Sequence, residues 1–297
     1  RSFIICKSFR KNFIMTNQNY LSLYAKSFNW AGFFLPKQTY QKCSALYDFC
    51  RVIDNIADDK GSVELRENKF KNFENNFNNK NFDDPIIKNM WDLIYEFNIS
   101  LKIIHDLFEG IKSDIKEKVK LNSRKELLVY SYKVAGTVGL LMAKILNVSK
   151  KSSLKSAIDL GIAMQLTNIS RDVIEDLDNN RSYINENFEE IHSTLMLAEK
   201  FYENSFHSIK EIPISFRFSI LVARRVYRKI GYKILKKKTL ENYRKSGKIY
   251  VSNIEKIIET FLSVFDLIKL ILINKNDENI EHDHLLINEE LNLNERL

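Results

Sequence analysis

Apolar residues recur at intervals of three and four along most of the chain, a spacing that places them on one face of an α-helix. The alternation of apolar and polar residues that is typical of half-buried strands does not extend over any useful length. Glycine and proline are scarce, with 8 and 3 copies in 297 residues. We therefore predict an all-α, single-domain helical bundle. Its main helices are expected at residues 20–30, 37–57, 86–97, 100–119, 130–146, 157–183, 189–206, 214–235 and 254–273.

Three segments lack this periodic pattern. An N-terminal extension over residues 1–19 begins with a basic and apolar stretch but has no cleavage signature of a targeting segment, so we expect Met15 to be the native start. Residues 60–85 are polar and rich in asparagine, which predicts a connector and leaves open a helix in front of it. Residues 274–297 are polar and acidic, and a frayed tail is expected there. The folded domain is thus predicted over residues 20–273.

The helix expected at residues 157–183 is apolar on nearly every side, as helices buried in a core are. Spacings of three, four and four nevertheless place four polar residues on one stripe of it, namely Gln165, Asn168, Asp172 and Asp176. Two carboxylates one turn apart repel each other, and burying either without a partner costs several kcal/mol. A compensating cation is therefore required, and we expect it to be Mg²⁺.

The helix expected at residues 37–57 repeats this construction, with one face that carries Tyr47, Arg51, Asp54 and Asp58 among apolar neighbours. One such carboxylate pair is usually an ordinary solvated helix face, but two pairs in apolar sequence indicate two halves of one site. Carboxylates can bind Mg²⁺ together with the oxygens of a diphosphate, whose charge must be neutralised before it leaves. The apolar faces would hold a hydrocarbon tail, and the rings of Tyr47 and Tyr130 would stabilise a carbocation. The residues thus predict an enzyme that ionises a prenyl diphosphate.

Gly136 and Gly139 lie inside the helix predicted at residues 130–146. Each interior glycine costs about 1 kcal/mol of helix stability relative to alanine. This cost indicates that something approaches the helix backbone closely. A neighbouring helix and a long apolar ligand explain the pattern equally well.

Composition narrows the classes of partner. The formal net charge of +8 favours an acidic partner such as a diphosphate or an anionic membrane surface, although codon bias explains the many lysines equally well. The lysines are scattered without a binding motif, so nucleic acid is not expected. Three cysteines without a CxxC pair indicate reduced core residues in a cytosolic protein. No run of 18 apolar residues occurs, so we expect a cytoplasmic protein with at most peripheral association at the inner face of the membrane.

Three stretches resemble the squalene/phytoene synthase family, above all its bacterial phytoene synthases. They are residues 27–59, YSYKVAGTVGLLMAKILN at 130–147 and AMQLTNISRDVIEDLDNNRSYI at 163–184. The pattern QLTNxxRDVxED is highly specific to that family, and the similarity spans about residues 20–260. The resemblance implies an isoprenoid-synthase fold with a central active-site cavity. It also implies head-to-head condensation of two isoprenoid diphosphates through a cyclopropylcarbinyl diphosphate.

The resemblance further implies roles for individual residues. It assigns Mg²⁺ binding to the two carboxylate pairs and their neighbour, that is to Asp54, Asp58, Asn168, Asp172 and Asp176. It assigns diphosphate contacts to Arg51, Arg171 and Tyr183, and proton removal and handling of the intermediate to Tyr47 and Tyr130. Other residues of the matching stretches are candidates for substrate contact, namely Ser27, Phe28, Val134, Gly136 and Gln165. One departure is Tyr24, which replaces a family histidine and removes a possible diphosphate contact.

The segment at residues 223–257 resembles bacterial phytoene synthases most. We therefore expect 15-cis-phytoene from two geranylgeranyl diphosphates, with Mg²⁺ or Mn²⁺ and without NADPH. A C30 product from farnesyl diphosphate, either squalene or dehydrosqualene, is the alternative. A head-to-tail elongase or terpene cyclase is disfavoured because those enzymes typically carry DDxxD. A non-catalytic family member that acts as a scaffold is a further alternative, although all four carboxylates are present.

Overall fold

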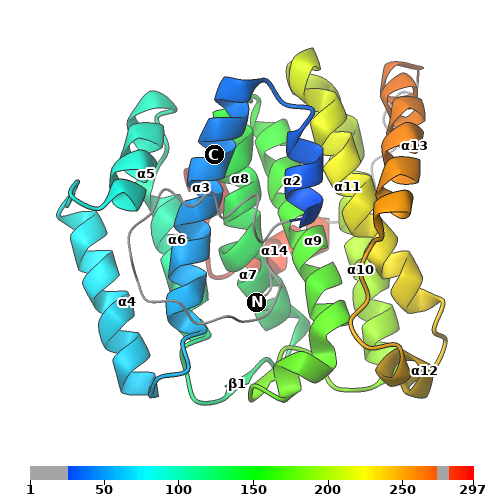
Figure 1. Ribbon diagram of the computed structural model, residues 1–297, viewed down its shortest axis with the longest axis horizontal. Helices are drawn as coiled ribbons and strands as arrows, with labels where there is room; N and C mark the ends of the chain where they lie inside the picture. Colours follow the sequence, from blue (N-terminus) through cyan, green and yellow to red (C-terminus); the bar gives the residue numbers. More distant parts are fainter. Residues whose placement is uncertain (1–25, 273–280) are drawn as a thin grey trace.

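A computed structural model describes residues 26–272 and 281–297, without the side chains of residues 26, 27 and 281 (Figure 1). The expected extension at residues 1–19 lies outside the described residues. The helices are α2 (Lys26–Gly32), α3 (Lys37–Ala57), α4 (Val63–Asn78), α5 (Pro85–Glu96), α6 (Leu101–Ser113), α7 (Arg124–Ser131), α8 (Thr137–Ile145), α9 (Lys151–Leu177), α10 (Phe188–Phe206), α11 (Ile214–Leu235), α12 (Leu240–Lys245), α13 (Asn253–Leu272) and α14 (Glu281–Asn288). Within the part of the chain that the structure describes, no helix is both long enough and apolar enough to cross a membrane.

The all-α prediction is confirmed, apart from one short parallel pair between β1 (Val119–Lys120) and β2 (Arg181–Ser182). Three helix predictions were wrong in extent. The helix expected at residues 100–119 ends at Ser113 as α6, and Val119 belongs to β1. The stretch at residues 130–146 is divided among α7, the π-helical turn η1 (Tyr132–Gly136) and α8, and the helix expected at residues 157–183 begins at Lys151 and ends at Leu177. A turn at residues 178–180 follows α9, and Arg181 and Ser182 are then extended because they pair with β1.

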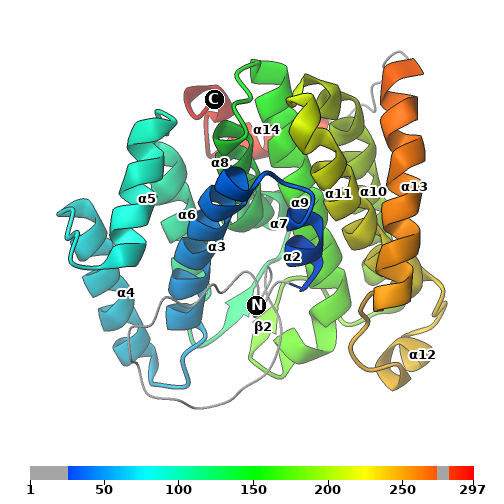
Figure 2. The ribbon, with the colours of Figure 1, turned by 45° about the horizontal axis from the view of Figure 1, so that its top comes forward.

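Helix α9 is the centre of the bundle. It packs against α8 and η1 on one side and against α10 and α11 on the other. Helix α3 packs against α4, α5, α6 and α8. Figures 1 and 2 show α3, α4, α5 and α6 in one half of the molecule, and α8 lies between α3 and α9. The two helices that carry the predicted carboxylate pairs therefore belong to opposite halves.

Aromatic packing anchors α4 in the segment that was expected to be a connector. Phe70, Phe73 and Phe77 recur at helical spacing and are buried, while the asparagines and charged residues of α4 face outward. Their rings meet Phe49 of α3 and Phe108 of α6, with centroids 5.3 to 6.4 Å apart. Contacts of this kind add to the burial of apolar surface. Most of residues 60–85 therefore form a helix, which one stripe of buried phenylalanines attaches to the bundle.

Helix packing accounts for the glycines of the η1–α8 segment. A Cβ atom on Gly139 would lie 2.2 Å from the carbonyl oxygen of Ala157 in α9, and one on Gly161 would lie 2.3 Å from that of Ala135. Real Cβ atoms essentially never come so close to another atom. The backbones of α8 and α9 are therefore in direct contact, which decides between the two explanations that the sequence left open for Gly139.

We predict that Gly139→Ala lowers the free energy of unfolding by about 2 kcal/mol, because the added methyl group must push two backbones apart. Gly231→Ala in α11 is the matched control, since its Cβ would meet only the flexible end of Leu195, at 3.2 Å. That variant should be neutral or gain up to about 1 kcal/mol in helix propensity. Urea denaturation followed by circular dichroism measures both. Equal stability of the two variants would contradict the packing argument.

The C-terminal segment is folded where the structure describes it, so the expectation of a frayed tail is wrong for residues 281–297. Helix α14 packs against α7, and the following turn η3 (Leu293–Glu295) buries Leu293. The Arg296 guanidinium donates two hydrogen bonds to Asp106, at 2.9 and 3.1 Å. His284 lies 2.7 Å from the fully buried carboxylate of Asp159. Alternating acidic and apolar residues look like a polar tail, but their partners lie on distant helices.

Stability should depend on pH through His284. Burial alone would lower the pKa of its imidazole, but the hydrogen bond and the charge of Asp159 outweigh burial and raise the pKa. The stabilisation by the charged imidazole is therefore fully present below the unfolded-state pKa of about 6.5. It is lost as the pH rises through the higher folded-state pKa.

We predict that unfolding free energies measured from pH 5.5 to 9 decline less steeply in His284→Gln than in the unmodified chain. The exposed His192 of α10 provides the control, and His192→Gln should retain the original decline. Identical pH profiles for all three proteins would show that the His284–Asp159 pair does not contribute.

Candidate active site

The carboxylate pairs lie at one end of the bundle. Helices α3 and α9 run in the same direction (Figure 1), and both line one cavity. Helix α3 ends at Ala57, so Asp58 caps its end, and α9 ends just after Asp176. Asp54, Asp172 and Asp176 are buried, with 5 to 7% of their surface exposed. Arg181 of β2 reaches across and binds Asp58 at 2.9 Å, so the two halves of the predicted site are brought together.

Three of the four carboxylates are paired with arginines. Arg51 binds Asp54 at 3.0 Å, and Arg171 holds Asp172 through two hydrogen bonds of 2.7 and 2.9 Å. Such charge-assisted pairs are the stronger class of hydrogen bond and offset part of the cost of burial. For Asp176, burial and then the negative charge of Asp172 raise the pKa to about 8. The four carboxylates thus outnumber their three arginine partners, and ionising Asp176 at neutral pH would require a further positive charge.

A second polar network stands beside these pairs. Tyr130 and Tyr183 both donate hydrogen bonds to Asp114, at 2.7 and 2.8 Å, and their rings stack with centroids 4.7 Å apart. Arg181 donates to the backbone carbonyl of Asp114 at 3.1 Å. Burial raises the pKa of Asp114, and the charge of Arg181 opposes this shift. Burial and then Asp114 raise the pKa of Tyr183, so its hydroxyl stays a hydrogen-bond donor at neutral pH.

Arg181 and Asp114 were missing from the predicted site. Arg181 follows the polar run DLDNN and reads in the sequence like any basic residue of a solvated loop. Asp114 follows α6 without an apolar run on both sides. Their role follows from the β1–β2 pairing, which brings the segments after α6 and α9 together. No local pattern signals this pairing, since each strand has two residues.

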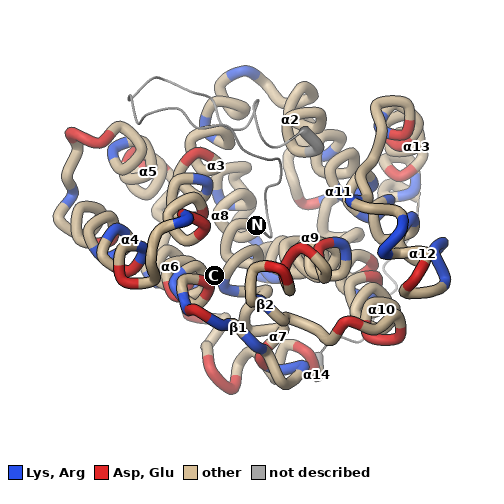
Figure 3. Tube along the Cα trace, turned by 60° about the horizontal axis from the view of Figure 1, so that its bottom comes forward, with Lys and Arg blue, Asp and Glu red and all other residues tan. Residues whose placement is uncertain are grey.

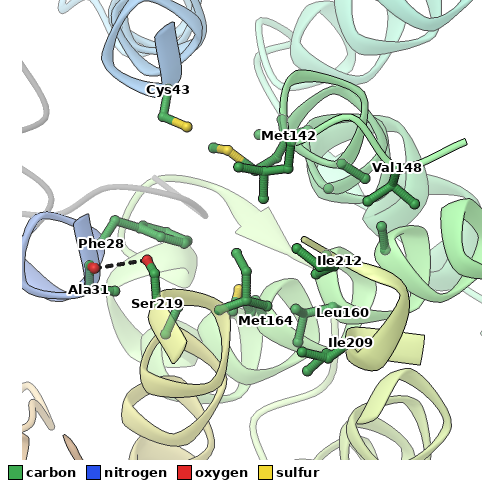
Figure 4. A pocket seen from close by; sticks show the side chains of 18 of the residues that line it. Phe28, Ala31, Cys43, Met142, Val148, Leu160, Met164, Ile209, Ile212 and Ser219 are labelled. Atoms are coloured by element: carbon green, nitrogen blue, oxygen red, sulfur yellow. Dashed lines mark hydrogen bonds between the residues drawn. The ribbon is translucent and has the colours of Figure 1, made fainter. Parts of the chain in front are cut away.

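An apolar cavity lies inside the bundle, and its lining reaches Cys50 of α3, one turn before Asp54, and Met164 of α9, two turns before Asp172. The space between its walls, open solvent included, is about 1190 Å³, and it is lined mainly by α2, α3, α8, α9, η2 (His207–Glu211) and α11. Figure 4 shows side chains from these elements turned toward it, among them Phe28, Met142, Leu160 and Met164. Tyr47 lines the cavity one turn before Arg51. The predicted central cavity is thus present, and its walls suit a hydrocarbon chain.

Two buried polar side chains at this end lack partners among the described residues. They are the hydroxyl of Tyr47 and both amide atoms of Gln165, whose side chain is completely buried. A buried polar group without a hydrogen bond typically costs about 1–3 kcal/mol. Such groups therefore call for a polar ligand, and these two belong to the stripes that carry the carboxylates.

The remaining predicted residues lie in different surroundings. Asn168 is buried one turn before Asp172, in line with the carboxylates. Val134 and Gly136 are buried in η1, where they face neighbouring helices and do not line the cavity. The side chain of Ser27 lies outside the described residues.

The carboxylates do not form a preassembled metal cage. Within residues 26–272 and 281–297, no three His, Cys, Asp or Glu side chains converge closely enough to hold a metal ion by themselves. Figure 3 shows acidic residues at the end of α9 beside basic residues of neighbouring segments. The oxygen donors have the hard character that Mg²⁺ prefers, but further ligands would have to come from elsewhere.

Comparison with known proteins agrees with this architecture. The family model described as squalene/phytoene synthase matches residues 21–190. The 15-cis-phytoene synthase of Pantoea ananas is 27% identical over 243 residues, covering 71% of this chain and 78% of that protein. Phytoene synthase 1 of Solanum lycopersicum is 28% identical, covering 79% of this chain and 63% of that protein.

Solved structures support the isoprenoid-synthase fold. A dehydrosqualene synthase crystallised with a ligand superposes with a TM-score of 0.65 at 24% identity, covering 84% of this chain and 94% of that one. The squalene synthase HpnC from Alicyclobacillus acidocaldarius gives 0.61 at 16% identity, covering 73% and 89%. At these identities the likeness concerns the fold, which was predicted from the sequence.

Proposed function

The chain belongs to the squalene/phytoene synthase family, and we propose that it joins two geranylgeranyl diphosphates head to head into 15-cis-phytoene. It is a prenyltransferase-type enzyme. The proposed reaction proceeds through a cyclopropylcarbinyl diphosphate and releases both diphosphates. One observation carries the proposal, namely an apolar cavity between α3 and α9, whose next turns carry two mostly buried carboxylate pairs with arginine partners.

The residues of the chain divide the chemistry between them. The cavity walls would hold the hydrocarbon tails and exclude water from cationic intermediates. Arg51, Arg171 and Arg181 would exchange their carboxylate partners in part for diphosphate oxygens, which guanidinium groups bind well. The ring of Tyr47, on the cavity wall, would stabilise positive charge through its π face. Tyr130, which donates a hydrogen bond to Asp114, would help to position the intermediate and to remove its proton.

The donor set fits Mg²⁺, or Mn²⁺ in its place. Asp54, Asp58, Asp172 and Asp176 would hold the metal with Asn168 nearby, and bound metal would neutralise the leaving diphosphate. Because the described carboxylates do not converge on their own, we propose that substrate phosphates complete the coordination. No NADPH is required for the proposed product.

Alternative products share the same site. The structural likeness to a dehydrosqualene synthase keeps farnesyl diphosphate open as a substrate and a C30 hydrocarbon as a product. Chain length would depend on how far the cavity extends past Leu160 toward Ile209 and Ile212. A non-catalytic scaffold is the alternative of another class, but the paired arginines and unpartnered Tyr47 and Gln165 favour a ligand-binding site. A cytoplasmic location stays a prediction.

Metal and diphosphate should bind together. We predict that Mg²⁺ alone or inorganic diphosphate alone shifts the midpoint of thermal unfolding little, whereas saturating amounts of both raise it by about 5 °C. The physical reason is that neither partner alone completes the coordination or balances the charge. Differential scanning fluorimetry measures the shifts. An equal shift with Mg²⁺ alone would indicate a preassembled metal site and contradict this prediction.

Product analysis tests the reaction itself. With Mg²⁺ and without NADPH, purified protein should convert geranylgeranyl diphosphate into a C40 hydrocarbon that gas chromatography identifies as phytoene. Asp172→Asn should reduce the rate at least about 100-fold, because it removes a metal ligand without changing side-chain size. Asp178→Asn, at an exposed position just after α9, is the matched control and should keep full activity.

Other outcomes of this assay are equally informative. If only farnesyl diphosphate is converted, farnesyl diphosphate is the substrate and the product is a C30 hydrocarbon. If conversion requires NADPH, the product is the reduced hydrocarbon squalene. Full activity of Asp172→Asn, with unchanged circular dichroism, would remove the metal assignment.

A further inference from the structure

Helix α13 has its polarity reversed relative to an ordinary surface helix. Its polar residues Glu259, Ser263 and Asp266 are buried against the protein. Its large apolar residues point outward, with between 48 and 75% of their surface exposed, among them Ile254, Ile257, Phe261, Phe265, Ile268 and Leu272. Soluble proteins rarely leave such a continuous apolar face uncovered, and a face of this kind marks an interaction site.

Ion pairs hold the helix in this orientation. Arg225 of α11 binds Asp266 through two hydrogen bonds of 2.6 and 2.9 Å and also binds Glu259 at 3.1 Å. Lys229 adds a second contact to Glu259 at 3.0 Å, and Lys233 binds Glu255 at 2.7 Å. Rotating α13 to bury its apolar face would break every one of these pairs. The outward apolar face is therefore a built feature of the fold.

A basic segment adjoins the beginning of this face. Between the end of α11 and the start of α13, residues 236–250 contain six lysines and arginines and one acidic residue, Glu241. Figure 3 shows this basic group around α12 beside α13. Tyr250, at its end, is 71% exposed next to Ile254. An apolar helix face bordered by positive charge and an interfacial tyrosine complements the surface of an anionic bilayer.

We propose that the outward face of α13 inserts into the interface of an anionic lipid bilayer, with Lys236, Lys237 and Lys238 at the headgroups. The other three basic residues of this segment already bind carboxylates of the chain, through the pairs Arg244–Glu186, Lys245–Glu241 and Lys248–Glu175. The positive border distinguishes this occupant from a second copy of the chain, which would bring an equally basic segment to the contact. The face is long enough for shallow insertion along the membrane plane, since a helix of 20 residues spans roughly 30 Å.

The bilayer contact would lie near the mouth of the proposed active site. Tyr243 of α12 donates hydrogen bonds to the backbone carbonyls of Ser170 and Arg171 in α9, at 3.1 and 2.7 Å. Lys248 binds Glu175, also in α9, at 2.6 Å. The basic segment is thus attached to the helix that carries the second carboxylate pair. In this respect the inference rests on the proposed function, because apolar substrates and products partition into lipid.

Vesicle flotation of the full chain, without substrate, tests the contact. The probe is vesicles of phosphatidylglycerol and phosphatidylcholine in equal parts, compared with phosphatidylcholine alone at low salt. The unmodified chain should float with the anionic vesicles. Phe261→Ser combined with Phe265→Ser should lower the partition coefficient at least about 10-fold, because two exposed aromatic anchors are lost.

The matched control removes two exposed aromatic residues elsewhere. Phe82→Ser combined with Tyr95→Ser alters the opposite edge of the molecule, around α5, and should change partitioning less than about 2-fold (Figure 1). Lys236→Gln combined with Lys237→Gln should weaken binding to anionic vesicles and reduce its dependence on salt. Equal losses in the α13 and control variants, or no flotation of the unmodified chain, would overturn the proposal.

Two further measurements identify the occupant. Tryptophan emission of Phe265→Trp should shift to shorter wavelengths when anionic vesicles are added, and emission of Tyr95→Trp should not. Sedimentation velocity without lipid should show the same molecular mass for the unmodified chain and the α13 variant. A dimer that the α13 variant dissociates would overturn the lipid contact in favour of a second copy. Because no step requires turnover, failure of the condensation assay leaves these results unaffected.

Discussion

The buried aspartates at the ends of α3 and α9 impose the main constraint on this molecule, because an unpartnered carboxylate in a protein interior costs several kcal/mol. Arg51 and Arg171 each neutralise an aspartate on their own helix. Arg181 instead comes from the segment after α9 and reaches Asp58 of α3. That single pair crosses the site and links the two halves of the bundle. The three arginines that offset the cost of burying these aspartates therefore lie where a diphosphate is proposed to bind.

The cavity and the charged end depend on each other. Apolar walls lower the local dielectric constant, so the arginine–aspartate pairs at the mouth interact more strongly than they would in water. The same walls exist because α8 and α9 approach through glycines, which lets α9 stand at the centre with side chains on every face buried. Close backbone packing at Gly139 and Gly161 thus supports both the position of the carboxylates and the shape of the cavity.

At the periphery, too, burial and ion pairing decide which side chains face the protein, but the side that is buried differs from one element to another. In α4 a polar sequence hides one buried aromatic stripe, and in the C-terminal segment charged residues find buried partners on distant helices. In α13 the charged residues turn inward to α11, and the apolar residues are left facing outward. In each case a charged side chain is buried where it has a partner of opposite charge. Apolar side chains can therefore be left exposed when the charged residues of the same helix face the protein.

The sequence by itself determined the helical class, the extent of α3, and the two stripes that carry Asp54, Asp58, Asp172 and Asp176, because helical periodicity is a local property. It also identified the family through a motif confined to α9. Only the tertiary structure decided the break at η1, the folding of the C-terminal segment, and the roles of Arg181 and Asp114. Those features arise from the β1–β2 pairing and from contacts between residues far apart in the chain. A local sequence pattern does not indicate such contacts, because they form only when the helices pack against each other.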